Sequence, residues 1–453
     1  MNRPSARLVA PRTLLLAGLA AVWMATHPFP AVAGDLSGYI NVGVAVRTGQ
    51  GDVIFNRQLV NGKFSHEANK MLSFRLETDF YHDRPYYRDG SRFKARVREG
   101  YAKLRFKNAD LKLGRAQITW GDIDGFIVAD QVSPFDLENF IVPPFDEIRL
   151  GVDGAFFDYY FTHAYALQLL WIANYSPPDL PPDGSPFDPF EIDRISDALP
   201  GPFQIVRKGQ ETPPNTFHNS QAGIRLTGTT KTADWQLGYL YAYDHVPFFD
   251  FTPDPNNPLA IDATPKHGRY HLMMGNVVFP FRDVLIRLET AYNKDRTMNV
   301  VPDTLPAPGA FPDFTVRQDQ WVTAGVVDLK PNISWWQNAD VSLQMIYDHI
   351  MDPTPGLARA DYSLYFSARL SAAYRNDTIK PKLFTIANTR GADMWLQALV
   401  DWEPIDRWRF SLEYDFFDGR PYLGFVPGEG DSGGIYGQFD KNDLVAISVR
   451  YSF

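Results

Sequence analysis

The chain ends in Asp443-Leu-Val-Ala-Ile-Ser-Val-Arg-Tyr-Ser-Phe453, a segment in which large apolar residues alternate with small or polar ones. Side chains alternate across a β-strand with a period of two, so the segment is expected to form a strand with one apolar and one wet face. A soluble sandwich could contain one such strand. Because the pattern recurs along the whole chain with charges on the wet face, it predicts an all-β fold, a transmembrane antiparallel up-and-down β-barrel.

Charged residues mark the wet face of several predicted strands. In residues 72–80, Arg75, Glu77 and Asp79 alternate with leucine and phenylalanine, a register that is rare for a soluble core strand. The same phase recurs in later segments. The predicted pore-lining residues are Arg75, Glu77, Asp79, Arg287, Glu289, Arg369, Arg375, Arg407, Arg409, Glu413 and Arg450.

The N-terminus has the features of a secretory signal peptide. Arg3, Arg7 and Arg12 precede the apolar run 13–24, and small residues lead up to Ala33, after which we expect cleavage. The run is shorter than the roughly 20 residues that cross a bilayer, which argues against an uncleaved anchor. We therefore expect residues 1–33 to be removed and residues 34–453 to form a single barrel domain.

The composition argues against several classes of function. The formal charge of -9 becomes -12 once the three N-terminal arginines are removed, which argues against nucleic acid as a partner. The chain has no cysteine, so disulfides and thiolate metal sites are impossible. Its histidines are scattered, without a pair at metal-ligand spacing on one strand or an evident catalytic partner. We expect no enzyme activity, no cofactor and no metal.

Seventeen strands are clear, and the topology requires one more. Bacterial barrels have an even number of strands, with short periplasmic turns and long outer loops, so an additional strand must lie between Thr48 and Asn69, and residues 52–60 can supply it. This gives about 18 strands, with 16 or 20 as alternatives because Pro381 weakens one segment. The clear strands are residues 35–47, 69–82, 93–106, 110–119, 146–161, 164–175, 217–229, 232–245, 266–280, 283–294, 314–329, 338–351, 361–375, 378–387, 390–402, 406–417 and 441–453.

Two outer loops stand out in this topology. The fourth loop, residues 176–216, is rich in proline. We expect it to be a mobile surface loop, and the alternative is a specific receptor site. The third loop, residues 120–146, is acidic yet also rich in phenylalanine, isoleucine and valine. A loop with that much apolar surface should pack against something. It can either fold into the lumen and narrow a channel or lie as a lid across the rim.

The strands beside the third loop carry the opposite charge. Carboxylates facing an arginine ladder would create a transverse field that orients polar solutes; alternatively, each arginine pairs with an acidic neighbour and stabilises the wall. A β-bulge near Gly100 is required if all the basic residues of that strand face inward. The candidates for the constriction are Arg96, Arg98, Lys103, Arg105, Arg115, Asp122, Asp124, Asp130, Asp136 and Glu138.

The segment Leu113-Gly-Arg-Ala-Gln-Ile-Thr-Trp-Gly121, followed by Asp130-Gln-Val-Ser-Pro-Phe-Asp-Leu137, resembles a signature of Gram-negative outer-membrane barrels. That signature reads Leu-Gly-Arg-Gln, Trp-Gly and Asp-x-x-Asn-Pro-x-Asp-Leu, and alginate-export barrels share a looser form. The chain departs from it at Ala116 and Ser133. The resemblance implies an outer-membrane pore of 16 to 18 strands. The alginate-export comparison would imply an arginine-lined conduit for an anionic polymer, and only Arg115 carries over.

The leading functional hypothesis is a channel for passive or facilitated diffusion of small hydrophilic solutes, including anionic ones. The alternatives are a polymer export conduit and a plugged barrel that acts as a receptor or adhesin platform. The expected partners are outer-membrane lipid and lipopolysaccharide, the transported solute, and the outer-membrane assembly machinery. That machinery would act through the C-terminal strand ending in Phe453.

Overall fold

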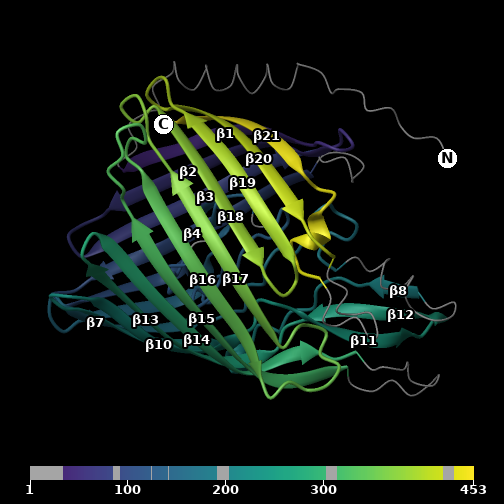
Figure 1. The fold of residues 1–453 in the computed structure, drawn as a ribbon. Coiled ribbons are helices and arrows are strands. Elements are labelled where there is room, and N and C mark those ends of the chain that lie inside the picture. The colour runs from purple at the N-terminus through teal and green to yellow at the C-terminus, as the bar shows by residue number, and fades with distance from the viewer. Residues whose placement is uncertain are drawn as a thin grey trace.

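The computed structural model describes residues 34–84, 92–123, 125–140, 142–190, 204–301, 314–421 and 433–453. Within them, 18 strands form one closed antiparallel sheet, which wraps into a barrel (Figure 1). The barrel strands are β1 (Asp35–Arg47), β2 (Val53–Glu67), β3 (Leu72–Asp83), β4 (Arg92–Arg105), β5 (Ala109–Ala116), β6 (Val152–Tyr160), β7 (Tyr165–Ile172), β9 (Gln221–Thr229), β10 (Asp234–Tyr243), β13 (Arg269–Phe281), β14 (Val284–Asn299), β15 (Thr315–Leu329), β16 (Asp340–Met351), β17 (Tyr362–Ser371), β18 (Ile379–Asn388), β19 (Asp393–Trp402), β20 (Trp408–Asp418) and β21 (Leu444–Ser452).

The predicted count of 18 strands is confirmed. The strand inferred from parity exists as β2, although it extends to Glu67, well beyond the predicted end. Pro381 lies inside β18, where its carbonyl still accepts a hydrogen bond from the backbone N–H of Ala372 at 3.1 Å. The expected signal peptide, residues 1–33, lies outside the described part of the chain.

Pairing of the first and last strands closes the barrel. Strand β21 is antiparallel to β1, with Val449 opposite Val42. Gly38 and Phe453 exchange both backbone hydrogen bonds at 3.0 Å. The C-terminal phenylalanine is thus part of the seam, at the end of the barrel that carries the short turns. We name this the turn end, and the opposite end the loop end.

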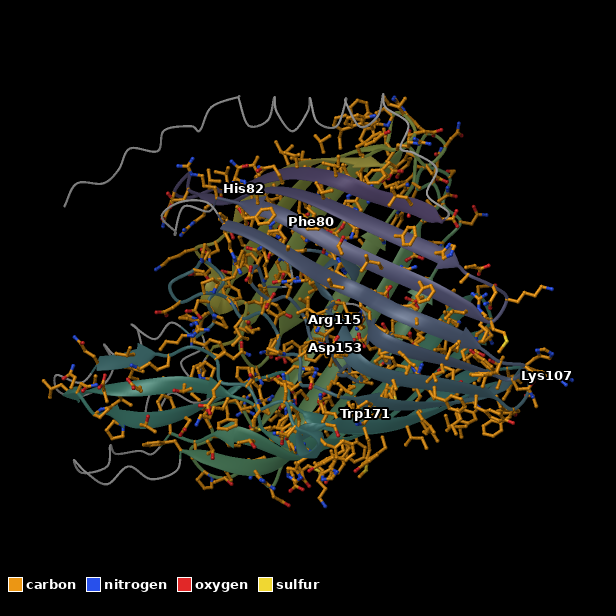
Figure 2. All side chains as sticks on the ribbon, turned by 180° about the vertical axis from the view of Figure 1, so that it is seen from behind. Phe80, His82, Lys107, Arg115, Asp153 and Trp171 are labelled. Atoms are coloured by element: carbon orange, nitrogen blue, oxygen red, sulfur yellow. The ribbon has the colours of Figure 1, made fainter. Side chains whose placement is uncertain are left out.

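Alternation along the strands separates an apolar outer face from a polar lumen. On β3, Leu76 and Phe80 are 44% and 45% exposed, whereas Glu77 and Asp79 between them are only 6% and 5% exposed. A face of exposed leucine and phenylalanine is stable only against lipid, while the charged face is covered from within. Figure 2 shows Phe80 and Trp171 on the outside of the wall. No helix among the residues described is long and apolar enough to cross a membrane.

A second, small sheet was not predicted. Strands β8 (Gln204–Arg207), β11 (Phe248–Asp254) and β12 (Asn257–Lys266) form a three-stranded sheet that projects beyond the loop end (Figure 1). Strand β8 pairs in parallel with β12, so it joins the fourth outer loop to the next one. Prolines interrupt β11 and β12, and β8 has only four residues, so period-two alternation gave no signal there.

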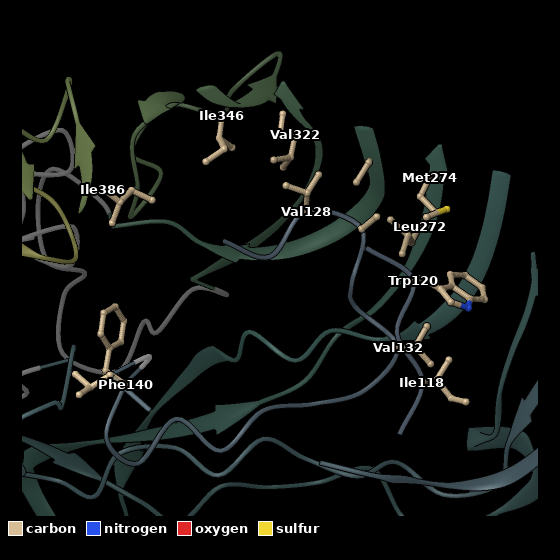
Figure 3. Close-up of a cluster of buried hydrophobic side chains, with 14 of the residues drawn as sticks. Ile118, Trp120, Val128, Val132, Phe140, Leu272, Met274, Val322, Ile346 and Ile386 are labelled. Atoms are coloured by element: carbon tan, nitrogen blue, oxygen red, sulfur yellow. The ribbon is translucent and has the colours of Figure 1, made fainter. Parts of the chain in front are cut away.

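The wall has an uneven height. Strands β14 and β15 contain 16 and 15 residues, whereas β5 and β7 contain eight each. At the short strands the chain leaves the wall after Ala116 and enters the barrel. The main cluster of buried apolar residues therefore lies inside the lumen, between this entering chain and the wall (Figure 3).

Candidate functional site

The segment between β5 and β6, residues 117–151, folds into the lumen; we refer to it as the inward segment. Trp120 and Val128 are 1% and 0% exposed. They belong to one buried cluster with Leu272 and Met274 of β13 and Val322 of β15 (Figure 3). Of the two arrangements left open by the sequence, the structure therefore has the lumenal one and not the lid across the rim.

Glu289 of β14 fixes the tip of the inward segment. The residue is 2% exposed, and its carboxylate accepts hydrogen bonds from the backbone N–H groups of Asp122 and Ala129, both at 2.8 Å. A Cβ at Gly121 would come within 2.8 Å of this carboxylate, so the close approach requires glycine. The Asp122 side chain accepts a hydrogen bond from Asn276 at 2.9 Å. One wall residue thus holds both sides of the 122–129 turn.

On the opposite side, ion pairs hold the inward segment to β4. Arg92 and Lys94 contact Glu138 at 2.6 and 3.2 Å, and Arg96 contacts Asp136 at 2.8 Å. Burial alone would raise the pKa of Asp136, but the neighbouring Arg96 and Lys94 bring it below its usual value. These carboxylates and arginines are in direct contact rather than separated by an open aperture. For these residues the arrangement therefore favours ion pairs that stabilise the inward segment against the wall over charges that create a transverse field across an open pore.

Asp179, from the chain after β7, completes this cluster. Its carboxylate contacts both Lys94 and Arg96. Together with Asp136 and Glu138 it forms a carboxylate group whose oxygens lie within 4.8 Å of one another, close enough for a shared metal ion. Because each of these carboxylates already pairs with a basic side chain, the cluster is better described as an ion-pair network.

The predicted bulge exists, two residues before Gly100. The register between β3 and β4 shifts between Glu77 and Thr78, which leaves Arg98 as the extra residue. As a result, all four basic residues of β4 named as candidates lie on the lumen side. Arg98 is 5% exposed and contacts Asp79 at 3.4 Å. Lys103 and Arg105 lie near the turn end, outside the constriction, where they pair at 2.8 and 3.0 Å with the residues Asp110 and Glu67.

Arg115 does not line the pore. It is opposite Asp153 in the β5–β6 register and shares its face with Leu113, which is 44% exposed to the outside. Arg115 and Asp153 form a bidentate pair with hydrogen bonds of 2.8 and 2.6 Å, seen on the outer surface in Figure 2. The sequence already indicates this outward position, because Arg115 lies two residues after the apolar Leu113 and residues two apart in a strand share a face.

Two of the residues predicted to line the pore lie outside the barrel strands. Arg375 and Arg407 lie exposed in the turns after β17 and β19, both with positive φ. The prediction was wrong because it extended the strand pattern into the turns. Asp124 lies outside the residues that the structure describes.

The other predicted pore-lining residues face the lumen, and most are paired with a neighbour on the wall. Arg287 contacts Asp328 at 2.8 Å, Arg369 contacts Asp340 at 3.2 Å, and Arg409 contacts Glu403 at 2.7 Å. Arg450 instead reaches Glu147 in the inward segment, within the short helix α2 (Phe145–Ile148). The lumen-facing set is Arg75, Glu77, Asp79, Arg287, Glu289, Arg369, Arg409, Glu413 and Arg450.

A cavity of about 590 Å³ remains in the lumen beside the inward segment. Ile123, Phe126 and Ile127 of that segment form its apolar side, while Asp234 and Arg287 of the wall contribute charge. Asp130 also lines this cavity; burial raises its pKa, although its partner Arg149 acts in the opposite direction. The free space is therefore amphipathic.

The fourth outer loop also enters the barrel. Phe187 is 1% exposed and packs edge-on against Phe417 and Phe439. Asp188 is buried and contacts Arg207 at 3.0 Å. The prediction of a mobile surface loop is therefore wrong for residues 176–190, and residues 191–203 lie outside the described chain. Phenylalanines between the prolines were the missed signal.

Sequence reasoning also missed several partners of the predicted residues. Arg92 and Lys94 share the lumen face of β4 with Arg96, so alternation could have identified them. Asp179 and His245 could not be found this way because they lie in irregular chain. His245 contacts the inward segment through the carbonyl of Val132 at 3.4 Å, and burial lowers its pKa to about 4.

Comparison with solved structures identifies proteins of similar fold. The Acinetobacter baumannii proteins OccAB1 and OccAB2 each match with a TM-score of 0.51, at 8% and 9% sequence identity. The matches cover 93% of this chain and 96% and 98% of those proteins. OprD from Pseudomonas aeruginosa matches with a TM-score of 0.47 at 10% identity, covering 93% of both chains. At these identities the likeness concerns the fold alone.

Comparison of the sequence itself gives a more specific result. No curated protein matches it significantly. Residues 55–453 match the model described as "Protein of unknown function (DUF1302)". This match spans β3 to β21, the whole inward segment and most of β2. The chain therefore belongs to the DUF1302 family.

Proposed function

We propose that this protein is an outer-membrane channel through which small hydrophilic solutes, including anionic ones, diffuse passively. The observation that carries the proposal is a closed barrel with a charged lumen, narrowed by an inward segment that leaves an amphipathic cavity beside it. A water-filled path lined by polar groups, with a constriction, is how barrel channels select solutes. Cleavage near Ala33, the periplasmic position of the turn end and insertion through the strand ending in Phe453 are parts of this proposal.

The contacts of the inward segment support a narrow aperture. The segment touches both β14, through Glu289, and β4, through the ion pairs of Arg92, Lys94 and Arg96. A segment attached on opposite sides divides the lumen instead of lining one wall. Solutes small enough to fit the 590 Å³ cavity are therefore the expected cargo, and a bulky polymer would require the segment to move.

Conductance of the purified mature chain in a planar lipid bilayer tests this proposal. We expect stable single-channel openings of small conductance, and a large increase after deletion of residues 122–145. Heat-modifiable mobility on gels would confirm that the deletion variant still forms a barrel. Absence of current from both folded proteins would overturn the channel.

The second candidate is a plugged barrel that acts as a receptor platform. It is favoured by the buried apolar cluster inside the lumen, which resembles a core more than a channel wall. In that case both proteins would be silent, and binding of intact cells or of lipopolysaccharide would depend on the sheet formed by β8, β11 and β12.

A further inference from the structure

An apolar groove of about 610 Å³ lies on the outer face of the wall, near the turn end. Leu383, Val400 and Leu412, on β18, β19 and β20, line it and are 38%, 41% and 54% exposed. Two adjoining positions, Pro381 and Ala398, carry small side chains, which create the depression. Because these residues belong to the lipid-facing set, the groove opens toward the membrane and not toward the lumen.

A structured turn covers one end of this groove. Residues 330–339 connect β15 to β16 and contain Trp335 and Trp336, whose rings are stacked with centroids 5.9 Å apart. Trp336 donates a hydrogen bond from Nε1 to the carbonyl of Ser371 at 3.1 Å, and Tyr374 donates one to the carbonyl of Trp335 at 3.2 Å. The turn is therefore fixed to β17, yet Trp335 stays 72% exposed.

Exposed tryptophan at a barrel end is typical of the membrane interface, where the ring contacts both acyl chains and headgroups. The groove below it would lie at the depth of the acyl chains. Two exposed guanidinium groups, Arg375 and Arg407, occupy the turns that follow β17 and β19, at the same end. Neither has an ion-pair partner among the residues that the structure describes, whereas the nearby Glu403 is already bound to Lys380 and Arg409 at 2.6 and 2.7 Å.

We propose that this groove binds one anionic phospholipid of the inner leaflet. An acyl chain fills the depression below Trp335 and Trp336, and Arg375 and Arg407 bind the phosphate group. Basic side chains beside an apolar groove recognise anionic headgroups by this combination of charge and burial. The exposed carboxylates Asp377 and Asp406 lie in the same two turns. They limit the net charge of the turns, so binding of phosphate requires direct contact with the two guanidinium groups.

Native mass spectrometry of the delipidated, full mature protein tests the site. The protein is mixed with dioleoylphosphatidylglycerol or dioleoylphosphatidylcholine in detergent, and the retained lipid is counted. We expect one phosphatidylglycerol per barrel at stoichiometric addition and at least fivefold lower occupancy with phosphatidylcholine. The groove-filling variant Ala398→Phe and the double variant Arg375→Gln/Arg407→Gln should each lose most of this bound lipid.

Matched controls separate this site from general lipid adhesion. Trp321 of β15 points outward and is 48% exposed, and Trp321→Ala removes it. Arg282→Gln removes an exposed arginine from the turn between β13 and β14. Both should bind lipid as the native protein does. Equal occupancy by both lipids, or unchanged binding in Ala398→Phe, would overturn the site. Since the groove lies outside the lumen, loss of lipid binding does not bear on conductance, and the lipid site and the channel fail separately. Only the assignment to the inner leaflet rests on the proposed periplasmic position of the turn end.

Discussion

The inward segment is attached to the barrel in two different ways. On the β4 side, Glu138 contacts two basic residues and Arg96 contacts two carboxylates, so the loss of one partner leaves others in place. On the β14 side, Glu289 alone accepts the N–H groups of Asp122 and Ala129. Redundant ion pairs tolerate substitution, whereas a single buried acceptor does not. Asn276 and Arg287 also donate hydrogen bonds to Asp122, so Glu289 is the one anchor on this side whose acceptor role no other described residue duplicates.

The largest effect is expected from Glu289→Ala. It leaves two buried N–H groups without an acceptor, at a cost of about 1–3 kcal/mol each. The 122–129 turn should loosen, although Asn276 and Arg287 still contact Asp122, and single-channel conductance should rise severalfold in planar bilayers. Glu289→Gln keeps a carbonyl oxygen that can accept one N–H, so it should change conductance much less. A native-like conductance of Glu289→Ala would show that Glu289 does not hold the segment.

A smaller effect is expected from Arg96→Ala on the opposite side. Lys94 and Arg92 would still hold Glu138, but Asp136 would lose its closest cation. The lumen should then favour cations, measured as a shift of the reversal potential by several millivolts in a salt gradient, with little change in conductance. Arg92→Ala serves as the control, because Lys94 also neutralises Glu138. A larger shift for Arg92→Ala would contradict the redundancy.

Acidification should loosen the inward segment on its third contact, at His245. Burial lowers the pKa of this imidazole to about 4, so the docked state favours the neutral ring. Docking is therefore fully stable above the ordinary histidine pKa near 6.5 and weakens as the pH falls toward 4. The open probability of the channel should therefore rise as the pH falls through this range. His245→Phe should remove most of this change in open probability. Burial also lowers the pKa of the nearby His267, but this ring contacts the carbonyl of Asp244 and not the inward segment.

The smallest effect is expected from Arg115→Gln. Its side chain lies on the outer face, paired with Asp153, and has no contact with the lumen. Conductance and reversal potential should match those of the native protein, and the melting temperature should fall by a few degrees at most. A selectivity shift as large as that of Arg96→Ala would place Arg115 inside the channel after all.

The wall could be predicted from the sequence because period-two alternation is a local property that each strand shows by itself. The same signal correctly required a bulge in β4, since its basic residues change phase near Gly100. It failed at Arg375 and Arg407, where the pattern was extended beyond the ends of the strands. It also failed at Arg115. This residue lies two positions after the apolar Leu113 and therefore shares its outer face, but it was assigned to the lumen together with the other arginines.

The interior could be predicted only in part. The apolar residues of the third loop implied that it packs against something, but a sequence does not specify the partner. Glu289 and Ala129 are far apart in the chain, and so are Lys94 and Asp179. Such contacts depend on how the closed barrel brings distant strands together. The resemblance to alginate-export barrels stays a prediction: of the arginine-lined conduit that it implies, only Arg115 carried over, and Arg115 lies on the outer face.

The bulge at Arg98 also constrains how this chain can change length during evolution. The residues of β4 before and after it are out of phase, and both sets of charges face the lumen only because one extra residue separates them. Loss of that residue would turn either Arg96 with Lys94, or Lys103 with Arg105, toward lipid. Family members should therefore vary in this strand by paired insertions or deletions, or by shifting the bulge, and rarely by a single residue.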